Sequence, residues 1–122
     1  MALRSTLTLC LSLLAANAVT ARDVHYKLVD TGVQTHSTHG TGIEMRVELT
    51  DAPPDFFTSD ALEPAMQHMC AQFAPSVVPW VKQQTGLESA DFIAVRVVTG
   101  GILGRYALER YALTANGCGS AL

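Results

Sequence analysis

Residues 42–50 read GIEMRVELT, and this stretch decides the fold class. Apolar side chains stand at every odd-numbered position from 43 to 49, and charged side chains stand at 44, 46 and 48. Strict alternation of this kind is typical of a strand that packs one face on a core and leaves the other face in water. We therefore predict a half-buried antiparallel strand over residues 42–50.

The segment before this strand predicts its hairpin partner. Residues 24–29 also alternate, with Val24, Tyr26 and Leu28 on one side. The link over 31–41 is polar and contains glycines. Because this link is longer than a tight hairpin turn, we expect it to project from the sheet as a mobile loop.

A helix is predicted after the strand over 42–50. Residues 51–55, Asp-Ala-Pro-Pro-Asp, break the sheet because proline lacks a backbone donor and restricts the residue before it. Apolar side chains then recur every three or four positions, which indicates one buried helical face. They are Leu62, Met66, Met69, Cys70 and Phe73. We expect Ser59 or Asp60 to cap the start of this helix and Pro75 to end it.

The rest of the chain predicts a second helix and two more strands. The second helix covers 76–84, with Gly86 just past its end. Residues 91–99 contain the run FIAVRVV, whose β-branched side chains are typical of a central strand. After a glycine-rich turn at 100–104, residues 105–114 return as the last strand.

These elements predict an α+β fold. Their order is β-β-α-α-β-β, and we expect a small antiparallel sheet with both helices packed on one face. A chain of 122 residues, 48% of them hydrophobic, suffices for one small domain and excludes a disordered or collagen-like protein. We expect residues 22–122 to form that domain.

Residues 1–21 predict a cleavable signal peptide. Arg4 supplies the positive charge, an apolar stretch over 7–16 follows, and small residues fit cleavage after Ala21 or, alternatively, after Ala18. The apolar stretch is too short to cross the ~30 Å hydrocarbon core of a membrane, which needs ~20 residues. We therefore expect a periplasmic or secreted protein with no membrane span in the mature chain.

The cysteines predict a structural disulfide. Cys10 lies in the predicted signal peptide, which leaves Cys70 and Cys118 as an even pair in an oxidising compartment. The alternative is a thiol-disulfide redox pair, but the chain has no Cys-x-x-Cys spacing, which is the arrangement that lowers a thiol pKa. We expect a bond that fastens the first helix to the tail beyond the last strand.

Charge and motifs exclude several classes of function. With 8 basic and 11 acidic residues, the formal net charge of −3 gives no basic surface for nucleic acid or anionic lipid. Neither a metalloprotease helix nor a Gly-x-Ser-x-Gly elbow is present. Glu44 and Glu48 would lie ~13 Å apart on one strand face, too far for a glycosidase pair. Tyr106 and Tyr111 should point to opposite faces and so cannot form one stacking platform.

His36 and His39 are the strongest candidates for a local site. They stand in the sequence His-Ser-Thr-His within the predicted loop, and imidazoles are good ligands for zinc or copper. A metal site also needs a third or fourth ligand, and no carboxylate or cysteine lies near them in the sequence. Two solvated loop histidines are therefore the preferred interpretation, and we expect no cofactor.

Three segments resemble a family of small exported bacterial proteins known only as a domain of unknown function. These segments are MCAQF at 69–73, FIAVRV at 92–97, and the stretch from Gly104-Arg-Tyr to Asn116-Gly-Cys118. The resemblance spans about half of the mature chain. It implies an exported domain with a disulfide between helix and tail, and it transfers no catalytic residue.

The most consistent functional reading is a non-enzymatic domain that contacts another protein or an envelope component. It combines a disulfide-bonded core, a polar loop and no convergent set of catalytic residues. A metal- or small-ligand-binding module that uses His36 and His39 is the alternative, and an enzyme is a third.

Overall fold

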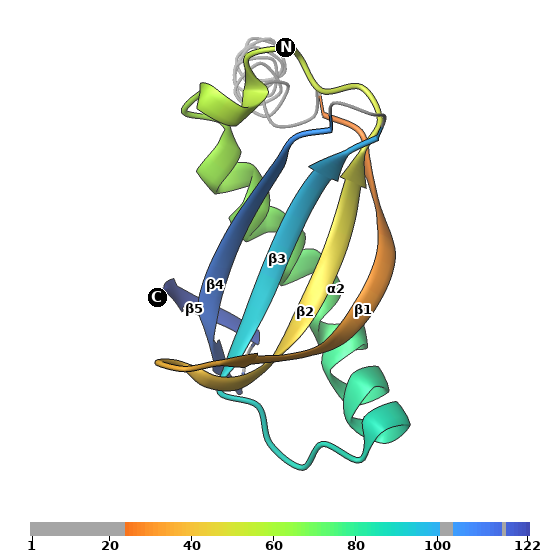
Figure 1. The fold of residues 1–122 in the computed structure, drawn as a ribbon, viewed down its shortest axis with the longest axis vertical. Helices are drawn as coiled ribbons and strands as arrows, with labels where there is room; N and C mark the ends of the chain where they lie inside the picture. The colour runs from red at the N-terminus through yellow and green to blue at the C-terminus, as the bar shows by residue number, and fades with distance from the viewer. Residues whose placement is uncertain (1–23, 101–103, 116) are drawn as a thin grey trace, which may run out of the picture.

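Five strands pair in the order β1-β2-β3-β4-β5 in a computed structural model that describes residues 24–100, 104–115 and 117–122 (Figure 1). The predicted signal peptide over 1–21 lies outside these residues. The strands are β1 (Tyr26–His36), β2 (Gly40–Leu49), β3 (Phe92–Thr99), β4 (Tyr106–Thr114) and β5 (Gly117–Ala121). A short 3-10 helix, η1 (Phe56–Thr58), precedes the long helix α2 (Leu62–Thr85). The α+β class is thus confirmed, but the observed order of elements is β-β-α-β-β-β.

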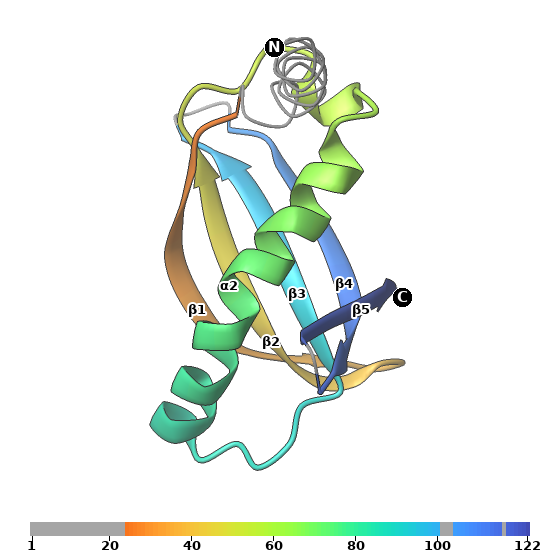
Figure 2. The same ribbon diagram turned by 180° about the vertical axis from the view of Figure 1, so that it is seen from behind.

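The sheet is mixed, so the prediction of an antiparallel sheet is wrong. β1 and β2 form an antiparallel hairpin, as do β3 and β4, but β2 and β3 run parallel at the centre. The cause is α2, which carries the chain from the end of β2 back to the opposite end of the sheet before β3 begins (Figure 2). A crossover of this kind lets two adjacent strands run in the same direction.

One continuous helix replaces the two predicted helices, the first of which was expected to end at Pro75 and the second to cover 76–84. Pro75 and Pro79 both lie inside α2, and both are exposed. The carbonyl groups that lose a donor to these prolines therefore lie on the solvent side, where water can satisfy them. The predicted end of the helix at Gly86 is confirmed, since this residue has a φ of 73° and its N–H bonds to the Lys82 carbonyl. At the start, no side chain caps the helix, and the N-cap is Ala61 instead of Ser59 or Asp60.

The predicted mobile loop over 31–41 is mostly paired strand. β1 continues to His36 and β2 begins at Gly40, which leaves only residues 37–39 as a turn. Gly40 has a φ of 89°, a conformation that suits glycine and lets the chain reverse sharply. The threonines of this segment favour extended backbone, so its polar composition does not prevent pairing with β2.

The short strand β5 was not predicted, because its sequence GCGSA has no alternating pattern. It pairs antiparallel with the end of β4 and crosses toward α2 (Figure 2). Cys118 on β5 is bonded to Cys70 on α2, and the two Cα atoms are 6.1 Å apart. The predicted disulfide between helix and tail is therefore confirmed.

The core lies between the sheet and α2. The odd-numbered side chains of β2 face the helix, as the alternation predicts, and Ile43, Met45 and Val47 are fully buried. Their counterparts on β3 and α2 are equally inaccessible. These are Ile93, Val95, Val97, Met69 and Cys70.

The opposite side of the sheet, which we call the open face, has no helix over it among the described residues (Figure 1). It carries the charged side chains of β2 and the polar or charged side chains that the register places on the same face of the neighbouring strands. These are Lys27, Asp30, Gln34, Glu44, Arg46, Glu48, Arg96, Tyr106 and Arg110. Phe92 also lies on this face yet is fully buried, because the end of the β1–β2 hairpin curls over the start of β3 (Figure 1).

Candidate functional site

The two histidines singled out in the sequence stabilise the β1–β2 turn. Their rings stack with centroids 4.7 Å apart. Nδ1 of His36 accepts hydrogen bonds from the backbone N–H groups of Thr38 at 3.1 Å and His39 at 3.3 Å. His39 also packs edge-on against Phe92, with ring centroids 6.5 Å apart. Both imidazoles are partly exposed, and the structure adds these specific contacts to the expectation of two solvated histidines.

This arrangement does little to favour a metal site at the turn. Partial burial lowers the pKa of His36, and the positive charges of Arg110 and His39 lower it further, which suits a neutral imidazole that accepts backbone bonds. Only Nε2 of this ring is left to bind a metal. In residues 24–100, 104–115 and 117–122, no three His, Cys, Asp or Glu side chains are grouped to hold an ion.

The Cys70–Cys118 pair is placed for a structural role. Cys70 is fully buried on the core side of α2, together with Met66 and Met69. The Cys70 sulfur is not accessible to the thiols that exchange with redox-active disulfides, and Cys118 is partly buried against the same core. The location therefore supports the structural interpretation over the redox alternative.

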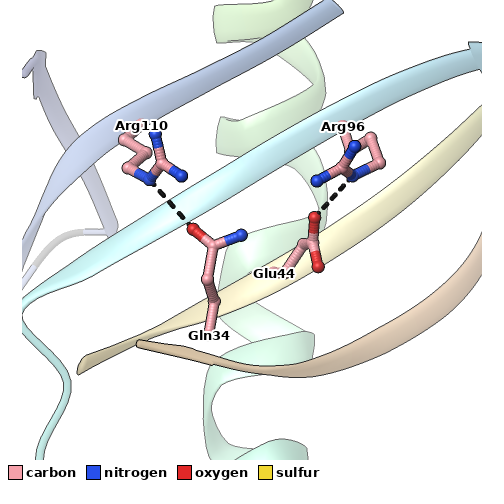
Figure 3. Close-up of polar contacts among 4 residues, drawn as sticks. All are labelled: Gln34, Glu44, Arg96 and Arg110. Carbon is pink, nitrogen blue, oxygen red and sulfur yellow. Dashed lines mark hydrogen bonds and ion pairs between the residues drawn. The ribbon is translucent and has the colours of Figure 1, made fainter. Parts of the chain in front are cut away.

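The open face holds a group of polar side chains that the sequence analysis did not combine into a site. Arg96 of β3 lies at its centre, and its Nε donates to Oε1 of Glu44 on β2 at 2.6 Å (Figure 3). The guanidinium of Arg96 also lies over the ring of Tyr106 on β4, 5.4 Å from the ring centroid. The carboxylate and the aromatic ring together fix the position of this guanidinium.

Arg46 is the direct cross-strand neighbour of Arg96. The register pairs Arg46 on β2 with Arg96 on β3, and on its other side Arg46 pairs with Asp30 of β1. Like charges directly opposite each other destabilise a sheet. Here each arginine also has a carboxylate neighbour, Asp30 for Arg46 and Glu44 for Arg96, and this concentration of charge on adjacent strands marks the open face as the candidate site.

Two hollows flank the Arg46–Arg96 pair. The larger has a volume of about 490 Å³ and the smaller one of about 110 Å³. Both are lined by Glu44 as well as by the two arginines. The larger hollow adds Arg105, Thr99 and Tyr106, the last of which is 66% exposed.

The charge of the larger hollow is opposite to that of the whole chain. Three arginines and a single carboxylate line it, whereas the chain has a formal net charge of −3. Guanidinium groups donate paired N–H bonds to carboxylates or phosphates. The bond from Arg96 to Glu44 uses only Nε, and a guanidinium has four further N–H donors. The arrangement can therefore bind an anionic group beside an exposed aromatic ring.

A second polar contact lies at the other end of the open face, near the turn of the β1–β2 hairpin. Nε of Arg110 on β4 donates to Oε1 of Gln34 on β1 at 2.9 Å (Figure 3). The Arg110 guanidinium lies over the Phe92 ring, 5.8 Å from its centroid. This contact holds the curled end of the β1–β2 hairpin over β3.

Sequence reasoning placed Glu44 on a solvated face, and the structure confirms its side of the sheet. It missed Arg96, although a single charged residue inside the apolar run FIAVRVV is a signal that could have found it. No helix in the described part of the chain is both long and apolar enough to cross a membrane. No protein-family model, curated protein or solved structure matches this chain.

Proposed function

We propose that this chain is an exported, non-enzymatic binding domain that contacts another protein through its open face. The observation that carries the proposal is the Arg46–Arg96 pair, in which two arginines lie opposite each other beside a hollow lined by Arg105 and Tyr106. The bond to Glu44 uses one N–H donor of Arg96, and the further N–H donors of the guanidinium groups can bind carboxylates that a partner brings to the pair. We therefore infer that the partner presents Asp or Glu side chains to this face.

The mixed charge of the open face favours a protein over a polyanion. Asp30, Glu44 and Glu48 alternate with the arginines across the sheet. A nucleic acid or an anionic membrane would meet these carboxylates together with the arginines, whereas a protein surface can present acidic and basic groups in a matching pattern. Exposed tyrosine and arginine are also enriched in protein interfaces.

The chemistry of these groups favours binding over turnover. An arginine stays protonated at all ordinary pH values, so it binds and orients anions but does not exchange protons as a general acid or base does. The alternative function, a metal-binding module built on His36 and His39, gains no third ligand from the described residues. It therefore ranks below the open-face proposal.

Export is part of the proposal. The Cys70–Cys118 disulfide supports it, because disulfides persist in the periplasm and outside the cell. The predicted signal peptide over 1–21 is consistent with that location. We expect the intact mass of protein recovered from the expressing cells to correspond to a chain starting at Arg22, or at Val19 for the earlier cleavage. Folded product that keeps residues 1–21 would contradict export by a cleaved signal.

The contact surface can be tested by photo-crosslinking in intact cells that naturally express the protein. A photoreactive amino acid at Tyr106, which is 66% exposed on the open face, should cross-link to a partner protein. The same group at Gln67, an exposed residue of α2 on the other side of the molecule, is the matched control.

Arg46→Glu should abolish the cross-link from position 106, because the carboxylates of the partner would then be repelled by the carboxylate of the new glutamate. Arg46→Lys keeps the charge but not the paired N–H donors, so it should weaken the cross-link without removing it. A partner captured from position 67 and not from 106 would overturn the proposal. A glycan or lipid adduct at 106 would show that the partner is an envelope component instead of a protein.

A further inference from the structure

A separate hollow lies on the helix side of the sheet, between the start of α2 and the first half of β4. Its volume is about 250 Å³. Leu62 and Met66 of α2 and Ala107 of β4 give it apolar walls, and Glu63 and Glu109 add one carboxylate from each element. None of the arginines of the open face lines it.

Tyr111 also lines this hollow, and its hydroxyl group lacks a partner. The residue is 2% exposed, and the hydroxyl has no hydrogen bond to any described residue. Buried hydroxyl groups are nearly always hydrogen-bonded, so this one calls for an explanation. Burial, together with the negative charges of Glu109 and Glu63, raises the pKa of Tyr111 to about 12. The group is therefore a hydrogen-bond donor at ordinary pH, and what it lacks is an acceptor.

The strand edge beside this hollow is open. β5 pairs with β4 only between Tyr111 and Thr114, and one further bond joins the Leu122 N–H to the Arg110 carbonyl. Residues 106–109 have no partner strand on that edge among the described residues.

The backbone groups available on this edge follow from the hydrogen-bond pattern. Within the β3–β4 ladder, the Thr99 N–H bonds to the Arg105 carbonyl, and the Leu113 N–H bonds to the Asp91 carbonyl. In an antiparallel ladder, every second residue of a strand bonds to the neighbouring strand and the residues between them do not. Tyr106 and Leu108 therefore direct their N–H and C=O groups away from β3. This half of β4 can therefore accept an added strand.

We propose that this groove binds an extended segment of a partner protein, which adds to β4 as a strand and places an Asn or Gln side chain in the hollow. Successive side chains of an added strand alternate between the two faces of the sheet, so those on the helix side would enter the hollow next to Ala107 and Glu109. A primary amide matches the groups found there. In the complex its carbonyl would accept from the Tyr111 hydroxyl, which has to turn from its buried position toward the hollow, and its NH₂ group would donate to Glu63 or Glu109.

Other side chains match less well. A lysine could pair with the carboxylates but would leave the tyrosine hydroxyl without an acceptor. A glutamate could accept from Tyr111 but would be repelled by Glu63 and Glu109. A leucine would fill the space and satisfy neither group.

Four acetylated and amidated pentapeptides test the proposal, Thr-Val-Xaa-Val-Thr with Gln, Lys, Glu or Leu at the centre. Titration into the ¹⁵N-labelled mature protein should shift the amide signals of Tyr106 and Leu108. The Gln peptide should bind roughly fivefold or more tightly than the Leu peptide, as expected for one net hydrogen bond to a buried group. In Tyr111→Phe this difference should fall below about twofold, because that hydrogen bond is lost.

Leu108→Pro tests the strand addition itself. It removes an outward N–H that makes no bond to β3, so it should weaken all four peptides, whereas Leu108→Ala keeps the N–H and should not. If Leu108→Pro does not fold, the proposal is still tested by comparing the preference for the Gln peptide in the natural protein and in Tyr111→Phe. Equal binding of the four peptides, or a Gln preference that survives in Tyr111→Phe, would overturn the proposal. These variants leave Arg46 and Arg96 intact, so the outcome is independent of the open-face function.

Discussion

Gln34 and Arg110 are joined by a hydrogen bond of 2.9 Å although β2 and β3 lie between their strands in the sheet. A flat sheet would keep two such side chains far apart, because neighbouring strands are about 4.8 Å from each other. The bond therefore requires the end of the β1–β2 hairpin to curl across β3, and it covers Phe92 in doing so.

Gln34→Ala should loosen this end of the hairpin. The variant removes the acceptor of the Arg110 N–H, and we expect a loss of about 1 kcal/mol of unfolding free energy, as for a typical hydrogen bond. Amide hydrogen exchange at the turn around residues 37–39 should become faster, while exchange in α2 stays the same. Gln84→Ala, at an exposed position of α2, is the control. Unchanged protection at the turn would show that the bond does not hold the curl.

Gly42→Ala should destabilise the fold through a steric clash. A Cβ atom at this position would lie within 2.5 Å of the Phe92 carbonyl oxygen and even closer to its ring. We expect a loss of ~1 to 3 kcal/mol in urea denaturation, the range for an overpacked site. Gly32→Ala is the matched control on β1, because its Cβ would meet nothing within 4 Å. Equal stabilities for the two variants would argue against the close approach of β2 to Phe92.

Removing the disulfide should leave the domain marginally stable. The bond joins cysteines separated by 48 positions, and Cys70→Ala combined with Cys118→Ala should lower the free energy of unfolding by ~2 to 5 kcal/mol. Thermal melting of the oxidised protein and of the double variant measures this loss. Two free thiols detected by mass spectrometry in protein from its native compartment, or ready cycling in a glutathione buffer, would instead favour a redox role.

Tyr111→Phe should stabilise the protein. It removes a buried hydroxyl that has no partner among the described residues, and we expect a gain of roughly 1 kcal/mol at pH 7. The natural protein should also lose stability as the pH rises from 10 towards 12. Tyrosine in the unfolded chain ionises near 10, whereas the raised pKa of about 12 keeps Tyr111 protonated in the folded state.

Denaturation at a series of pH values separates the alkaline loss of stability caused by Tyr111 from any loss caused by Tyr26. Burial also raises the pKa of Tyr26, so Tyr26→Phe is the comparison. The alkaline loss should be smaller in Tyr111→Phe than in the natural protein. A destabilised Tyr111→Phe at pH 7 would mean that the hydroxyl already has a partner.

The His36–His39 turn should not bind zinc or copper tightly. One nitrogen of His36 already accepts two backbone N–H bonds, and the described residues supply no third ligand. Isothermal titration of the mature protein should therefore show no stoichiometric submicromolar site. A tight site that disappears in the double variant His36→Ala, His39→Ala would restore the metal-binding alternative.

Local patterns predicted the faces of the elements well. Alternation over 42–50 correctly placed Ile43 and Met45 in the core and Glu44 on the other face, because a period of two depends only on neighbouring residues. The apolar periodicity likewise placed Cys70 on the buried face of the helix. An oxidising compartment then implied its pairing with Cys118, the other cysteine outside the predicted signal peptide.

Features that depend on distant contacts were not predictable in this way. Proline was expected to end the helix at Pro75 because it lacks an N–H donor, but α2 continues through it, and packing of the long helix on the sheet outweighs the loss of one hydrogen bond on the solvent side. The Arg46–Arg96 pair depends on the register of two parallel strands joined by a long crossover. Sequence reasoning assigned each arginine to a strand and had no means of placing them opposite each other.

The parallel pairing of β2 with β3 should also govern the folding kinetics. Each hairpin forms from residues close in the chain, but Ile43 meets Ile93 only after the whole of α2 has closed a long loop. We therefore expect docking of the two hairpins across this seam to be the slow step of folding. Val95→Ala, at the seam, should lower the refolding rate in stopped-flow experiments. Leu113→Ala, next to β5, should mainly raise the unfolding rate, and the reverse result would place the nucleus at the edge of the sheet.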